Sequence, residues 1–170
     1  LLSISQMEGR ARLLELDSVN LHDLLLRVLE NLDPTISETK ACIQIDWPDD
    51  ARTVQADCRR MEQVYLILLT NALRYGDSGD LVLSITAKRY EHTIAIAIAD
   101  NGPGIPEEIQ ATLFEPFVST KRGGQGLGLA LVAKLVTDLG GLIECDSRPG
   151  RTQFRLSMPA PPAGWQESAA

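Results

Sequence analysis

Two glycine-rich segments constrain this chain more than any other feature. The first is Asp100-Asn101-Gly102-Pro103-Gly104-Ile105, and the second is Gly124-Gln125-Gly126-Leu127-Gly128-Leu129. An acidic, aromatic stretch at 113–121 lies between them. Because glycine has no Cβ and tolerates positive φ, each segment lets backbone approach a ligand closely. One segment opens with a carboxylate and the other leads into a helix, which predicts a nucleotide pocket with separate base and phosphate ends.

The composition is that of one acidic globular domain. The chain has 170 residues, of which 44% are apolar and 23% charged, and this length can bury a core without disulfides. The net charge of −7 and the pI of about 4.8 argue against general binding to nucleic acids or to anionic membranes. A phosphate ligand therefore needs backbone N–H groups, a few basic side chains and a metal ion.

The cysteines favour a reducing compartment. Cys42, Cys58 and Cys145 are odd in number and lack metal-ligand spacing, so we expect free thiols in the cytoplasm. No signal peptide and no apolar run of spanning length is visible. The chain begins at Leu1 without a methionine, so we interpret it as part of a longer protein, either soluble or membrane-anchored.

Apolar spacing predicts mixed helices and strands. Helices are expected to end at residue 16 and to occupy 21–32, where Asn20 is the cap and Asp33-Pro34 the stop, and 58–75, 106–110 and 127–139. Strands are expected at 41–47, 53–56, 81–88, 93–99, 142–147 and 152–158, and residues 16–20 are expected to form a short extended segment. Neighbouring strands form hairpins rather than repeated βαβ units. This order predicts an α+β fold, a two-layer α/β sandwich in which helices pack on one face of a mixed, mostly antiparallel sheet.

Asp100 continues the apolar face of a predicted strand. The alternating isoleucines of 93–99 point to the same side as Asp100. A carboxylate there is costly unless it is paired, and the amino group of adenine would pair with it, whereas guanine presents an acceptor. The alternative is a carboxylate that caps the following turn through the N–H groups of Asn101 and Gly102.

The second glycine set leads into an apolar helix. The N-terminus of a helix presents free N–H groups and the positive end of its dipole, which suits phosphate. The segment is not a P-loop, because no Gly-Lys-Ser/Thr follows, and its spacing does not fit a dinucleotide fingerprint. The alternative is a flexible hinge with close helix packing around Gly124, Gly126 and Gly128.

Asn71 lies at the edge of the apolar stripe of the helix predicted at 58–75, with Ile67 and Arg74 on the same side. A neutral amide at the rim of a pocket can ligate Mg²⁺ while phosphates supply the other oxygens. Arg74 could contact phosphate, and Tyr75 could pack on a base. The alternative is an ordinary solvated helix face.

Four segments, taken in order, carry a resemblance to a known family. They are 63–75, 100–104, 114–117 and 124–129. Together they resemble the ATP-binding catalytic domain of bacterial sensor histidine kinases, within the Bergerat-fold ATPases. The stretches at 114–134 and 148–152 are most similar to the nitrogen-regulation and oxygen-sensing kinases.

The resemblance implies three parts and a set of partners. Residues 1–16 would end a dimerisation and phosphoacceptor helix hairpin, 17–159 would form the ATP-binding catalytic domain, and 160–170 would be a disordered tail. The parent would be a homodimer whose partners are its own hairpin and the receiver domain of a response regulator. Neither nucleic acid nor direct membrane contact is expected of this chain.

The resemblance also implies roles for the matching residues, with ATP and Mg²⁺ as cofactors. Asn71 would hold Mg²⁺ and Arg74 would touch phosphate, which makes these two the catalytic residues. Asp100 would accept from the adenine amino group, and Thr152 would help through water. Phe114 and Phe117 would anchor a lid at 114–125. The other nucleotide contacts would be Tyr75, Gly102, Gly104, Ile105, Lys121, Gly124, Gly126, Leu127 and Gly128.

The chain departs from the family pattern in two ways. Ile67 stands where such kinases carry an Asn and where related gyrase, chaperone and mismatch-repair ATPases carry a water-activating Glu, so a self-sufficient ATPase is not expected. Neither His22 nor His92 matches the phosphoacceptor. Two functions stay open, namely a kinase module that transfers phosphoryl to a histidine elsewhere and a nucleotide-binding regulatory module without transfer.

Overall fold

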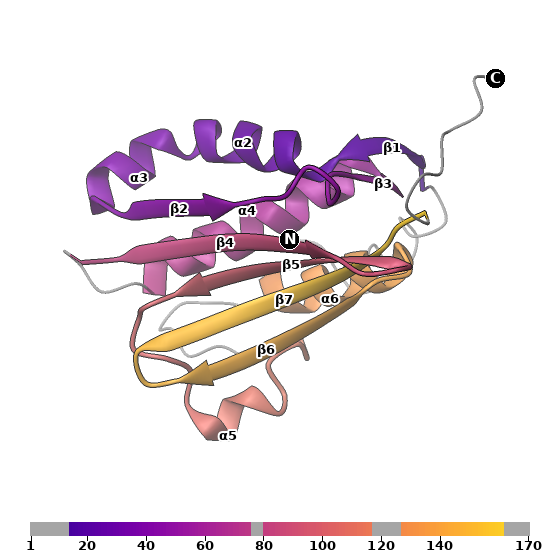
Figure 1. The fold of residues 1–170 in the computed structure, drawn as a ribbon. Coiled ribbons are helices and arrows are strands. Elements are labelled where there is room, and N and C mark those ends of the chain that lie inside the picture. Colours follow the sequence, from indigo (N-terminus) through magenta and orange to yellow (C-terminus); the bar gives the residue numbers. More distant parts are fainter. Residues whose placement is uncertain (1–13, 76–79, 117–126, 162–170) are drawn as a thin grey trace.

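The computed structural model describes residues 14–75, 80–116 and 127–161 (Figure 1). Its main sheet has five strands in the order β2-β4-β5-β7-β6. Strands β2 and β4 pair in parallel, and the other three pairs are antiparallel. The bounds are β2 (Cys42–Asp46), β4 (Val82–Arg89), β5 (Thr93–Asp100), β6 (Leu142–Arg148) and β7 (Arg151–Pro159). The mixed, mostly antiparallel sheet predicted from the sequence is confirmed.

Helices pack on one face of this sheet and complete the two-layer arrangement (Figure 1). The helices are α2 (Leu21–Asn31), α3 (Asp33–Thr39), α4 (Cys58–Tyr75), α5 (Glu107–Gln110) and α6 (Gly128–Asp138). A second, two-stranded sheet joins β1 (Asp17–Asn20) to β3 (Thr53–Ala56) in antiparallel register. Across the described ranges, the structure contains no helix with the length and apolar character needed to cross a membrane.

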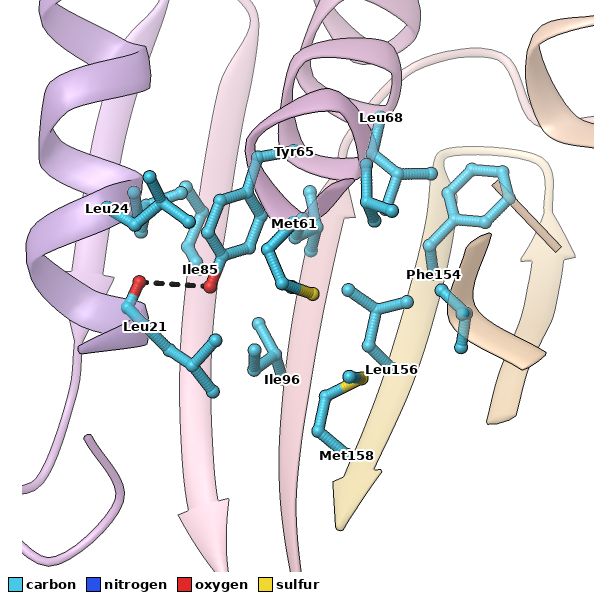
Figure 2. Packing of buried hydrophobic residues seen from close by; sticks show 14 of the residues in the cluster. Leu21, Leu24, Met61, Tyr65, Leu68, Ile85, Ile96, Phe154, Leu156 and Met158 are labelled. Atoms are coloured by element: carbon cyan, nitrogen blue, oxygen red, sulfur yellow. Dashed lines mark hydrogen bonds between the residues drawn. The ribbon is translucent and has the colours of Figure 1, made fainter. Parts of the chain in front are cut away.

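The core forms between α4 and the sheet, where a helical stripe of period 3.6 meets strand faces of period 2. The phenol of Tyr65 is fully buried there and donates a hydrogen bond to the Leu21 carbonyl oxygen at 2.9 Å, which ties α4 to α2 (Figure 2). Burial raises the pKa of Tyr65. Side chains packed around it include Leu24, Met61, Leu68, Ile85, Ile96 and Leu156. This packing holds α4, which carries Asn71, against β5, which ends at Asp100.

The helix after β1 begins as predicted but is followed by a second helix. The Asn20 side chain accepts from the Asp23 N–H at 3.0 Å and caps α2. The sequence predicted that Asp33-Pro34 weakens or ends this helix, and α2 does end at Asn31, but α3 begins directly afterwards with Pro34 in its first turn. Proline is compatible with that position because the first N–H groups of a helix have no intrahelical partner. The motif that ends one helix therefore also starts the next.

Both ends of the described chain differ from the sequence expectation. Residues 14–16, expected at the end of a helix, have no regular secondary structure, and the Glu15 N–H donates to Asp57 Oδ2 at 3.0 Å. Ala160 is buried and its N–H donates to the His92 carbonyl oxygen, so packed chain extends beyond the predicted boundary at 159. The rest of the predicted first helix and of the tail lies outside the described residues.

Candidate functional site

Asp100 ends β5 on the face that packs against the helices. The isoleucines before it on that face are at most 2% exposed and Asp100 is 8% exposed, so the predicted alternation is confirmed. Its Oδ1 accepts the Gly102 N–H at 2.9 Å. Burial raises the pKa of the Asp100 carboxyl, and the Gly102 bond offsets part of that rise. A carboxylate has about four acceptor positions, so the turn-capping role and a ligand role are compatible.

Thr152 and Ile105 meet beside Asp100. Thr152 is the cross-strand partner of Asp100 in the β5–β7 ladder and is 5% exposed. Its Oγ1 lies 2.7 Å from Ser147 Oγ on β6, and the Ile105 N–H donates to Ser147 Oγ at 2.8 Å. Ser147 therefore links two predicted nucleotide contacts, Thr152 and Ile105, and Thr152 lies next to Asp100. The sequence analysis missed Ser147 because its partners lie far away along the chain.

The glycine turn after Asp100 is seated on the β6–β7 hairpin. Gly104 has a φ of 90°, and a Cβ at this position would lie 2.6 Å from the Arg148 carbonyl oxygen. The Gln110 amide donates to the carbonyl oxygens of Ile105 at 2.8 Å and of Ser147 at 3.1 Å. A residue other than glycine at 104 would thus meet both backbone strain and a steric clash. Gln110 is a second supporting residue that the sequence did not reveal.

Phe114 places the start of the stretch between the glycine segments next to the base end. Its ring centroid lies 6.3 Å from that of Phe154 in an edge-to-face arrangement at 75°. Phe154 is two residues from Thr152 on β7, so both side chains point to the same face of the sheet. The predicted lid anchor Phe117, the predicted lid contact Lys121 and the predicted phosphate contacts Gly124 and Gly126 lie outside the described residues.

The predicted phosphate end begins at the first turn of α6. Leu127 is the N-cap residue, and among the described residues no side chain caps this helix. The Ile67 Cγ2 atom lies 3.3 Å from where a Cβ of Gly128 would be, so glycine lets α6 start close against α4. Asn71, one turn after Ile67, is half-buried, and Arg74 is exposed in the last turn of α4. The side chain of Tyr75 falls outside the described residues.

Asn71 offers one amide oxygen on this side of α4. Across the part of the chain that the structure describes, no three His, Cys, Asp or Glu side chains gather in a way that could hold a metal. The neighbouring Ile67 is apolar. Mg²⁺ commonly takes one or two protein ligands and completes its shell with phosphate oxygens and water. A single amide oxygen from Asn71 fits that pattern when phosphates are present.

Comparison with known proteins identifies the family of this chain. Residues 56–162 match the family model described as histidine kinase-, DNA gyrase B-, and HSP90-like ATPase. The sensory histidine kinase/phosphatase NtrB of Rhizobium leguminosarum bv. phaseoli is 36% identical over 150 residues, a match that covers 79% of this chain and 35% of NtrB. The chain therefore spans about a third of the length of that relative.

Solved structures give the same result for the fold. Full-length ShkA in complex with AMPPNP matches with a TM-score of 0.80 and 30% identity over 94% of this chain and 34% of ShkA. Histidine kinase ThkA in complex with the response regulator protein TrrA matches with a TM-score of 0.74 and 26% identity, over 89% of this chain and 44% of that one. The predicted fold class is confirmed.

Proposed function

Because this chain belongs to the histidine kinase-, DNA gyrase B- and HSP90-like ATPase family, we propose that it binds Mg–ATP and supplies the γ-phosphoryl group to a histidine of its parent protein. The phosphoryl group would then pass to an aspartate on a response regulator. The observation that carries the proposal is the buried Asp100 beside Thr152 at the end of β5, on a domain of the histidine kinase catalytic type.

The base end selects adenine through hydrogen bonding. Asp100 accepts from the exocyclic amino group, and the turn held by Gly102 and Gly104 forms the wall around the ring. A guanine carbonyl oxygen would face the same carboxylate without a proton between them. In a buried site, such an unpaired contact disfavours guanine because neither group keeps its water.

At the phosphate end, backbone N–H groups and positive charges bind the phosphates. The uncapped first turn of α6 from Leu127 and Gly128 presents N–H groups to the phosphates, and we assign Gly124 and Gly126 to the same cradle. Arg74 and Lys121 supply positive charge. Mg²⁺ held by Asn71 and the phosphates would neutralise charge on the transferring group. Phosphoryl transfer depends mainly on such positioning and charge stabilisation.

The nucleophile comes from outside the described residues. His22 is half-buried, its ring lies 5.6 Å from that of Trp47, and its Nδ1 lies 3.0 Å from an Arg52 nitrogen. His92 is exposed in the turn between β4 and β5. Neither histidine lies at the nucleotide site. We therefore place the acceptor on a helix hairpin elsewhere in the parent protein, and we propose that this parent is a homodimer with this domain in the cytoplasm.

Two measurements on the purified domain test the function. Calorimetric titration with ATP, ADP and GTP, each with and without Mg²⁺, is expected to show adenine-selective binding that Mg²⁺ strengthens for ATP. Incubation with γ-labelled ATP and a separately supplied acceptor hairpin of the parent is expected to label the hairpin histidine. An unlabelled hairpin at saturating Mg–ATP would contradict the kinase assignment while leaving nucleotide binding intact.

Ile67 motivates the second candidate, a nucleotide-binding regulatory module without transfer, and Ile67→Asn separates the two. We expect the variant to change the transfer rate by less than about threefold, because the phosphates and Asn71 already hold the metal. It should also lose roughly 1 kcal/mol of stability, because the Ile67 side chain packs against the hydrophobic core. Leu66→Asn, on the exposed side of the same turn, is the control for the substitution itself. A large gain in transfer would instead favour the regulatory module.

A further inference from the structure

We propose that Ser147 orients the hydroxyl of Thr152 as a hydrogen-bond donor toward the purine, which makes Ser147 a positioning residue for base selection. The inference rests on the proposed function, because it takes Asp100 and Thr152 as the base end of a nucleotide site. It assigns a role to a β6 serine that the family resemblance left without one.

The direction of the hydrogen-bond chain follows from its first member. The backbone N–H of Ile105 can only donate, and it donates to Ser147 Oγ at 2.8 Å. A hydroxyl that accepts one bond becomes a better donor, so chains of hydroxyls polarise head to tail. Thr152 Oγ1, 2.7 Å away, is the next atom along the chain. Ser147 therefore donates to Thr152, and the proton of Thr152 is left for the next acceptor.

The opposite direction is less favourable. If Thr152 donated to Ser147, Ser147 Oγ would accept two bonds, one of them from Ile105, and its own proton would need another acceptor. Ser147 is half-buried at the strand end, and the carbonyl oxygen of the same residue already accepts from Gln110. In the head-to-tail chain Ser147 accepts one bond and donates one, and only the proton of Thr152, which is 5% exposed, remains for a ligand.

The Thr152 hydroxyl, at the end of this hydrogen-bond chain, lies next to the Asp100 carboxylate. Thr152 and Asp100 are cross-strand partners, and such residues have Cβ atoms roughly 4.5–5.5 Å apart. One offers a donor and the other an acceptor, side by side. The edge of adenine carries the complementary pair, the amino group as donor and ring N1 as acceptor. Hypoxanthine and guanine carry the reverse pair, a carbonyl oxygen and an N1–H. Selection then acts at two atoms, directly or through a water.

The test compares the affinities of ATP and ITP by calorimetry, since ITP reverses both hydrogen-bonding positions of the base edge. For Ser147→Ala we expect ATP affinity to fall about fivefold, as for the loss of one oriented hydrogen bond, with little change for ITP. Thr152→Val should show the same loss, and the double variant should lose no more than either single variant. Ser147→Thr, which keeps the hydroxyl, should retain the wild-type preference.

A control variant and two further outcomes distinguish a positioning role of Ser147 from a purely structural one. Ser84 pairs with Ala99, so it lies on the opposite face of the sheet from Asp100, and its hydroxyl donates to Gln44 Oε1. Ser84→Ala should therefore leave the ATP-to-ITP ratio unchanged. If Ser147→Ala leaves the ratio of ATP affinity to ITP affinity at the wild-type value, the positioning role is overturned, whereas nucleotide binding itself is not. If folded wild-type protein binds neither ATP nor ITP, the proposed function itself fails, and the inference fails with it.

Discussion

Replacing Asp100 with Asn is expected to weaken ATP binding by more than about thirtyfold while leaving the nucleotide-free domain at least as stable as the wild type. The Asn oxygen can still accept the Gly102 N–H that Asp100 Oδ1 accepts at 2.9 Å. Its amide NH₂ would then point at the adenine amino group, donor against donor. Leaving two buried donors unpaired costs roughly 2 kcal/mol or more, which corresponds to that factor in affinity.

The expected stability of Asp100→Asn follows from the loss of the buried negative charge of the Asp100 carboxylate. Burial raises the pKa of Asp100, so ionisation of the wild-type carboxyl costs folding free energy. As the pH rises from the unfolded-state pKa of about 4 through the higher folded-state pKa, the wild type loses stability that the neutral Asn keeps. Between these two pKa values, the free energy of unfolding of Asp100→Asn should therefore rise relative to that of the wild type as the pH increases. At higher pH the difference should stay constant.

Urea denaturation at a series of pH values measures this difference, and calorimetry with ATP measures the binding loss. Asp46→Asn removes the same charge at an exposed end of β2 and is the matched control. It should change neither ATP affinity nor the pH dependence in this way. Wild-type ATP affinity in Asp100→Asn would contradict the role assigned to the carboxylate.

How much of this site was predictable depends on the range of the interactions involved. The alternation along 93–99 predicted the inward face of Asp100, because a period of two fixes side-chain direction within one strand. The alternation of apolar positions likewise predicted most strands, and the stripe on α4 predicted its buried side. In each case the determining information lies within a few neighbouring residues, so the sequence carries it directly.

Interactions between distant segments were not predictable in this way. Ser147 bonds to Ile105 across 42 positions, and Gln110 bonds to Ser147 across 37. Their roles depend on the β5-β7-β6 strand order, which local spacing does not encode. The close approach of Ile67 on α4 to the backbone position of Gly128 on α6 is of the same kind. Sequence reasoning identified Ile67 as an unusual residue, but only the packing of α4 on α6 shows what the side chain touches.

Gly104→Ala tests whether the base end depends on the seating of the glycine turn. At Gly104 the φ of 90° disfavours any side chain, and the added Cβ would lie 2.6 Å from the Arg148 carbonyl oxygen. Strain of about 1–2 kcal/mol and a clash with backbone together predict a loss of about 3 kcal/mol in the free energy of unfolding. Because Ile105 is the next residue, the shift that relieves the clash also breaks its bond to Ser147. ATP affinity should therefore fall at least tenfold.

Gly150→Ala separates the two causes. Gly150 has a similar φ of 88°, but an added Cβ there has no neighbour within 4 Å, so the variant carries the backbone strain without the clash. Chemical denaturation should give a loss of about 1–2 kcal/mol for Gly150→Ala, with ATP affinity close to wild type. The excess loss in Gly104→Ala then measures how firmly the β6–β7 hairpin holds the turn. Equal ATP affinities for Gly104→Ala and Gly150→Ala would contradict this prediction. The close packing of the Gly104 turn on the Arg148 backbone would then have no part in nucleotide recognition.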